Sequence, residues 1–215
     1  MGTPLQDTKN LFDSIFSHKQ KQQVVDILKE INENINEYKT DFLWGFDKEI
    51  GGIGGYCLPC DPKLNPYPAG EYRKLFRPLQ YARSEIEIIN VHFHSRYTVI
   101  YSGMHLEEVV RIVLKRKKIL GIRYFNSTLG KAAHILSKEQ SIPRFLIDGL
   151  FYFVKNYNLS KHEVNMDEER ERLFIADDAI ICYLAARIIG HELLKLIEHD
   201  STKYIYSIDT TEFVF

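Results

Sequence analysis

The feature that most constrains this chain is a long apolar segment in its C-terminal part. Hydrophobic residues between Leu173 and Ile189 occupy most of the circumference of a helix that we expect over residues 168–198. Such a helix has to be surrounded by other elements, because only burial removes its apolar surface from water. The sequence therefore predicts a bundle in which this helix is central.

Most of the other periodic segments also show the three- and four-residue spacing of helices. Residues 20–40 carry one apolar stripe, and a shorter helix is expected just before them, so that the two could pack as a hairpin. Residues 71–95 are expected to be helical, with a kink or a break at Pro78. Further helices are expected over residues 104–118, with Leu106, Val109, Val110 and Val113 on the inner face, over residues 127–137, and over residues 143–162, where Pro143 suits a first helical position.

Three segments do not fit helices. Residues 42–70 hold six of the twelve glycines and four of the seven prolines, which predicts a long loop. Residues 97–101 are β-branched and aromatic, and residues 203–215 alternate, so we expect a short strand and a terminal strand or hairpin that could pair with it. The expected fold class is mainly α, a helical bundle with a small β element near the C-terminus and a long Gly/Pro-rich loop.

Size, charge and cysteine content narrow the classes of function. The chain has 215 residues and a formal net charge of −1, so nucleic acid or an anionic membrane would have to be bound by a local patch. Residues 1–10 lack a signal-peptide pattern, and no run approaches the roughly 18 apolar residues of a membrane span. Three cysteines, an odd number, argue against a disulfide framework. We therefore expect a cytoplasmic protein with no membrane partner.

The helix expected at 143–162 has a polar face. If it is continuous, Asp148, Lys155, Asn158 and His162 fall within about 80° of one another. His162 could act as a general acid or base near neutral pH, with Asn158 one turn earlier orienting it or holding a phosphate. The alternative is that these residues form the solvated face of a core helix, since helices are amphipathic by default.

Residues 157–162, which read Tyr-Asn-Leu-Ser-Lys-His between two long helices, resemble a motif of the HEPN superfamily of helical bundles. Many HEPN proteins are ribonucleases, often toxins or defence effectors, that dimerise so that two arginine-polar-x-x-x-histidine motifs meet. The resemblance covers about residues 103–197. It implies a HEPN-like core in residues 103–215, with the helices and loop of residues 1–102 packed on it as one compact unit.

The resemblance implies catalytic roles for His162 and Asn158. Tyr157 stands where the family has arginine, which removes the fixed cation expected to hold the scissile phosphate. Lys155 or Lys161 could supply charge instead, and these two lysines and Tyr157 are the expected substrate-binding residues. The implied activity is RNA binding or metal-independent RNA cleavage by a homodimer, with no cofactor. The alternative is a catalytically degenerate module that binds a second copy or a protein partner.

The last long helix carries two further pairs of polar residues. Asp177 and Asp178 lie near its start, where acidic side chains complement the helix dipole. A functional interpretation is that one of them approaches His162 and fixes its tautomer. Arg187 and His191 lie one turn apart, and Arg187 could instead form a buried pair with an acidic residue of a neighbouring helix.

Cys57 and Cys60 have the spacing of half a zinc site. The chain offers only Cys182, inside the apolar helix, or His92 and His94 to complete it, so we predict no metal site. A zinc-binding regulator built on this loop is the remaining alternative.

A basic run covers residues 115–118, and Arg111 and Arg123 extend it. These cations could contact RNA phosphates, or they could stabilise the end of a helix through its dipole.

Overall fold

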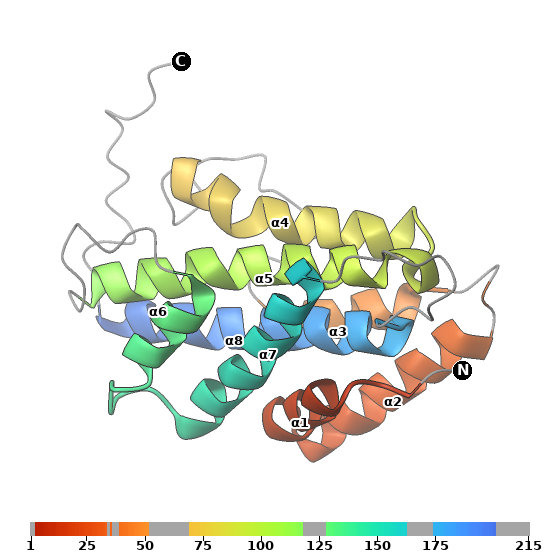
Figure 1. Cartoon of the computed structure of the whole chain (residues 1–215), viewed down its shortest axis with the longest axis horizontal. Coiled ribbons are helices and arrows are strands. Elements are labelled where there is room, and N and C mark those ends of the chain that lie inside the picture. The colour runs from red at the N-terminus through yellow and green to blue at the C-terminus, as the bar shows by residue number, and fades with distance from the viewer. Residues whose placement is uncertain are drawn as a thin grey trace.

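The computed structural model describes residues 3–33, 35, 39–51, 69–117, 128–162 and 174–200, with the backbone alone at 69–73, 162 and 198–200. Within these segments the chain forms eight helices and no strand, which confirms a mainly helical bundle (Figure 1). The helices are α1 (Gln6–Ile15), α2 (His18–Glu33), α3 (Asp41–Ile50), α4 (Ala69–Glu87), α5 (Val91–Arg116), α6 (Leu129–Leu136), α7 (Arg144–His162) and α8 (Ala176–Asp200).

Helix α8 occupies the centre of the bundle, as its apolar sequence predicts. Every residue from Asp178 to Gly190 is buried. The helix packs along α5 and also contacts α1, α2, α3 and α7 (Figure 1). It begins at Ala176, and the earlier part of the predicted helix, residues 168–173, lies outside the described residues. One hydrophobic core therefore draws on all eight described helices.

Helices α4 and α5 pack side by side and are joined by the short turn 88–90 (Figure 1). Pro78 lies inside α4 without ending it, and the predicted helix over 71–95 instead ends at Glu87. The strand predicted at 97–101 is wrong, because these residues belong to α5. Thr98 and Val99 are buried there, so packing outweighs the strand preference of β-branched residues.

The loop predicted at 42–70 is wrong over its first part. Residues 41–50 form α3, which buries Leu43, Trp44, Phe46 and Asp47. Gly45 interrupts this apolar pattern in the sequence, although the spacing of Leu43, Phe46 and Ile50 is that of a helix. Residues 52–68 of the predicted loop lie outside the described residues.

The remaining predicted helices are confirmed as α1, α2, α5, α6 and α7, although α2 ends at Glu33 rather than at residue 40 and α5 begins at Val91 rather than at residue 104. In α5 the predicted inner-face residues are buried. Pro143 directly precedes α7, and its carbonyl accepts the Leu146 amide at 3.1 Å. Helices α1 and α2 are linked by a Lys21–Asp13 ion pair of 2.9 Å, but α1 packs mainly on α7 and α8, and α2 on α8 and α3. These two helices therefore pack mainly on other helices of the bundle, and they do not form the hairpin that the sequence suggested.

Two other expectations concern the start of the HEPN-like core and the strand or hairpin at the C-terminal end. The position between residues 102 and 103, where the HEPN-like core was expected to begin, lies within the continuous helix α5. The terminal strand or hairpin at 203–215 lies outside the described residues. Among the helices that are described, none has the length and apolar character needed to cross a membrane.

Candidate functional site on α7

Helix α7 buries one side in the bundle and turns a polar stripe outward. The helical repeat of about 100° per residue places Arg144, Asp148, Lys155, Asn158 and position 162 within about 80° of one another. We call these five residues the polar stripe. The side chains of Arg144 and Lys155 are 75% and 60% exposed, and Asn158 is exposed as well. The expected common face of α7 is therefore an open surface. At residue 162 the structure describes the backbone alone.

The charged members of the polar stripe are paired with neighbours. Arg144 Nε lies 3.0 Å from Asp148 Oδ1, and Lys155 Nζ lies 3.0 Å from Asp7 Oδ1 of α1. Exposed pairs of this kind contribute only about 0–1 kcal/mol and exchange readily for other partners. Asp148 lies 14 residues before position 162, which is about 21 Å along the helix. The structure therefore does not bring Asp148 to the His162 end of the stripe.

Asn158 is the polar side chain nearest to position 162 on the stripe. It is exposed, and within the described part of the chain it has no hydrogen-bond partner. Its amide can both donate and accept, and it lies one turn from position 162. It is therefore available to a ligand that approaches this end of α7.

Tyr157 lies on a different side of α7, inside the interface with α5. Its ring is nearly fully buried and covers Gly103 so closely that a Cβ there would lie 2.1 Å from Tyr157 Cδ2. Burial raises the pKa of Tyr157 well above its usual value, and the charge and hydrogen bond of Glu107 raise it further. The ring is thus a neutral part of the helix packing, and a substrate could reach it only if α7 moved.

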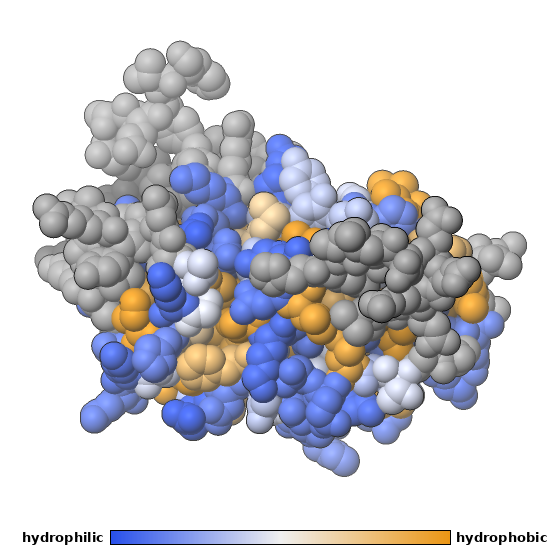
Figure 2. Space-filling model, in the orientation of Figure 1, coloured by the Kyte–Doolittle hydropathy of each residue, from blue (hydrophilic) through white to orange (hydrophobic). Residues whose placement is uncertain are grey.

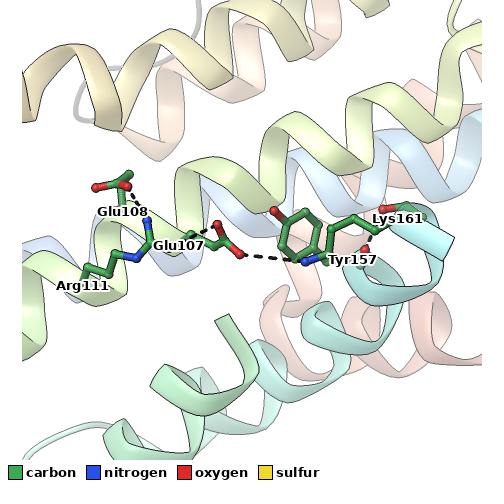
Figure 3. Close-up of polar contacts among 6 residues, drawn as sticks. Glu107, Glu108, Arg111, Tyr157 and Lys161 are labelled. Atoms are coloured by element: carbon green, nitrogen blue, oxygen red, sulfur yellow. Dashed lines mark hydrogen bonds and ion pairs between the residues drawn. The ribbon is translucent and has the colours of Figure 1, made fainter. Parts of the chain in front are cut away.

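Lys161 belongs to a small charge network around Tyr157 (Figure 3). Its Nζ lies 3.9 Å from the centre of the Tyr157 ring and 4.0 Å from Glu107 Oε1. Arg111 completes the network with contacts of 3.6 Å to Glu107 and 2.5 Å to Glu108. Two cations thus face two carboxylates, so Lys161 would have to leave Glu107 before it could contact a phosphate.

Asp177 and Asp178 attach other parts of the chain to the start of α8. The buried Asp178 carboxylate accepts the Leu5 amide at 2.9 Å and the Ile175 amide at 3.1 Å, one on each oxygen. Burial raises the pKa of Asp178, although these hydrogen bonds oppose the shift. Asp177 accepts the Asn32 amide at 2.7 Å. These contacts support the structural interpretation, and a role in orienting His162 stays a prediction.

Arg187 forms a buried ion pair with an acidic residue of a neighbouring helix, which was the structural interpretation of this residue. Its Nε donates to Asp47 Oδ1 at 2.6 Å, and both side chains are almost fully buried. Its Nη2 also donates to the Gly51 carbonyl at 2.8 Å. The pair therefore fixes α3 and its C-terminal end against the central helix.

His105 is a buried histidine whose local sequence pattern does not indicate its role. Its Nδ1 lies 2.6 Å from the Leu75 carbonyl, which can only accept, so Nδ1 carries the proton. Burial lowers the pKa of His105 to about 4, and the Arg187 charge adds to this, although the Leu75 hydrogen bond opposes it. Its Nε2 faces Gly190 so closely that a Cβ there would lie 2.4 Å away. His105 is therefore a neutral packing group.

Nothing in the described segments completes a zinc site. Cys57 and Cys60 lie outside them, and Cys182 is buried in α8 with the Asn156 amide 3.6 Å from its sulfur. His92 contacts the Ile31 carbonyl and His94 pairs with Glu85. No three His, Cys, Asp or Glu residues of the described segments are arranged to hold a metal ion.

Comparisons with models of protein families, with curated proteins and with solved structures give no match for this chain. The case for a function therefore depends on the polar stripe and its surroundings.

Proposed function

We propose that this chain is a cytoplasmic RNA-binding protein and metal-independent ribonuclease of the toxin or defence type, acting at the His162 end of the polar stripe. The observation that supports this most is Asn158, an exposed amide without a partner in the described part of the chain, one turn before position 162. The resemblance of residues 157–162 to the HEPN motif supplies the class of substrate. In that family two copies of the motif meet across a dimer, so we propose a homodimer in which the two His162 ends come together.

In the proposed reaction His162 removes the proton from a ribose 2′-hydroxyl, and the oxygen attacks the adjacent phosphorus. The bond from phosphorus to the 5′-oxygen of the next nucleotide breaks, and that oxygen takes a proton from the His162 of the second copy. The products are a 2′,3′-cyclic phosphate and a 5′-hydroxyl. The Asn158 amide donates to a phosphate oxygen, and Lys161 offsets its charge after leaving Glu107.

The test is the rate of RNA cleavage by His162→Ala and by His18→Ala, which removes an exposed histidine of α2. Loss of a general acid–base group lowers the rate by about 10²- to 10⁴-fold, so we expect His162→Ala to lose at least 100-fold with an unchanged Tm. His18→Ala should cleave as the wild type does. Equal activity of both variants would overturn the proposal.

A second candidate function is a non-catalytic interaction module, and an exposed apolar surface favours it. Around the turn between α4 and α5, Ile88 is 81% exposed and Phe93 60% exposed, with Tyr97 close by on α5. Large apolar side chains gathered at a surface are typical of protein interfaces. If this candidate is right, Phe93→Glu will abolish self-association or partner binding in sedimentation experiments, and His162→Ala will change nothing.

A further inference from the structure

Cations gather at the end of the bundle where α5 ends and α6 leads into α7. The described segments 115–117 and 128–144 carry six lysine or arginine residues and one acidic residue, a net charge of +5 in a chain of net charge −1. Lys117 Nζ lies 3.5 Å from Ser141 Oγ, which places the end of α5 beside the turn into α7. We call this surface the basic end and define it by Lys115, Arg116, Lys117, Lys131, Lys138 and Arg144.

The basic end also contains a hollow of about 540 Å³ in the turn between α6 and α7. Ser137, Ser141 and Arg144 line it together with apolar residues, and Glu139 is its acidic member. The N-terminus of α7 lies here and adds the positive end of its dipole. Figure 2 shows hydrophilic side chains over α6 and this turn, with hydrophobic ones between them. The hollow itself holds one cation, Arg144, and one carboxylate, Glu139, so the attraction for an anionic ligand comes from the other cations of the basic end.

Phe145 adds an exposed aromatic ring beside the basic end. Its side chain is 47% exposed, and it directly follows Arg144 at the start of α7. An exposed aromatic ring near a basic surface can serve as a platform for single-stranded nucleic acid, because any base can stack on it while cations contact the backbone. A lipid surface would instead require a broad apolar face, and among the described residues 115–117 and 128–145 Phe145 alone is an exposed large apolar side chain.

We infer that the basic end is a docking surface for the phosphate backbone of single-stranded RNA, with a base stacked on Phe145. This inference rests on the proposed function and extends it, because Arg144 belongs both to the basic end and to the polar stripe. The stripe runs from Arg144 to position 162 over about 27 Å. At about 3.4 Å per stacked nucleotide, a strand of about eight nucleotides reaches from one end to the other.

The experiment measures the Kd of a labelled twelve-nucleotide 2′-O-methyl oligouridine, which has no free 2′-hydroxyl to attack, by fluorescence anisotropy. The triple variant Lys131→Ala, Lys138→Ala, Arg144→Ala removes three cations of the basic end. The matched control Lys9→Ala, Lys19→Ala, Lys29→Ala removes three exposed lysines of α1 and α2, so that the net charge changes equally.

We expect the basic-end variant to bind at least tenfold more weakly, and the slope of log Kd against log salt to fall by about two, since three phosphate contacts contribute about 0.7 each. The control should change Kd less than twofold. Phe145→Ala should weaken binding at least fivefold without changing the salt slope. A four-nucleotide strand should bind more weakly than the twelve-nucleotide strand.

Equal weakening in both triple variants, or no weakening in either, would overturn the inference. So would loss of binding to anionic lipid vesicles, rather than to the oligouridine, in the basic-end variant. The outcome is separable from the proposed reaction, because binding that depends on the basic end without cleavage that depends on His162 would retain the docking surface and reject the ribonuclease. If cleavage depends on His162 but binding does not depend on the basic end, the ribonuclease is retained and the docking surface is rejected.

Discussion

The Arg187 guanidinium and the Asp47 carboxylate meet 2.6 Å apart in the interior of the bundle, joining the central helix α8 to α3. Removing one partner leaves the other charge buried and unpaired, which costs about 3–5 kcal/mol. We therefore expect Asp47→Ala to lower the free energy of unfolding by about this amount in chemical denaturation. Arg144→Ala, which removes an exposed pair, should lower it by less than about 1 kcal/mol. Similar losses in the two variants would contradict the importance of the buried pair.

His105 makes the stability of the protein depend on pH. Burial lowers the pKa of His105 from 6.5 to about 4, so below about pH 6.5 the unfolded chain binds a proton that the folded chain does not. Stability should therefore fall as the pH drops from about 6.5 to about 4, by about 3 kcal/mol in full.

The variant His105→Gln checks this pH dependence, because its amide can still donate to the Leu75 carbonyl but does not titrate in this range. Denaturation curves between pH 4.5 and 7.5 should show a weaker dependence on pH in the variant than in the wild type. The same dependence in both proteins would assign the effect to other groups.

The contact between Gly103 and the Tyr157 ring predicts a large effect from one added methyl group. Gly103→Ala would place a Cβ 2.1 Å from the ring, and overpacking of this kind costs about 1–3 kcal/mol. Gly45→Ala in α3 meets nothing within 4 Å, so it should stabilise the protein by about 0.5–1 kcal/mol through helix propensity. Thermal unfolding should show Tm changes of opposite sign, and two changes of the same sign would contradict the packing of α5 against α7.

The pairing of Lys161 with Glu107 predicts a gain of RNA affinity. Glu107→Gln keeps the size of the side chain and frees Lys161 from its carboxylate, so binding of the 2′-O-methyl oligouridine should become two- to fivefold tighter if Lys161 contacts phosphate. Glu108→Gln, which loses a carboxylate paired with Arg111 rather than with Lys161, is the matched control. Equal gains in both variants would indicate a general charge effect.

The helices could be predicted where one periodic pattern decides the structure, as it does for α7 and α8. Residues 97–101 could not, because the local preference of Thr98 and Val99 for strands yields to their burial in α5. Helix α3 was not predicted, because the glycines and prolines that follow it led to a loop being expected over the whole of residues 42–70.

The candidate site was predictable to the same extent. The register of α7 places Asn158 and position 162 together, since this depends only on the helical repeat. The burial of Tyr157 depends on Gly103, and the partner of Arg187 lies 140 residues earlier in the chain. Such contacts are set by the packing of distant helices, and no local pattern marks them.

The chemical identity of the ends of cleaved RNA tests the proposed ribonuclease most directly. With purified protein in the presence of a chelator and a short oligoribonucleotide, the account predicts 2′,3′-cyclic phosphate and 5′-hydroxyl ends, produced by the wild type and lost with His162→Ala. Ends carrying 3′-hydroxyl and 5′-phosphate groups, or cyclic phosphate ends that persist at the wild-type rate in His162→Ala, would contradict it.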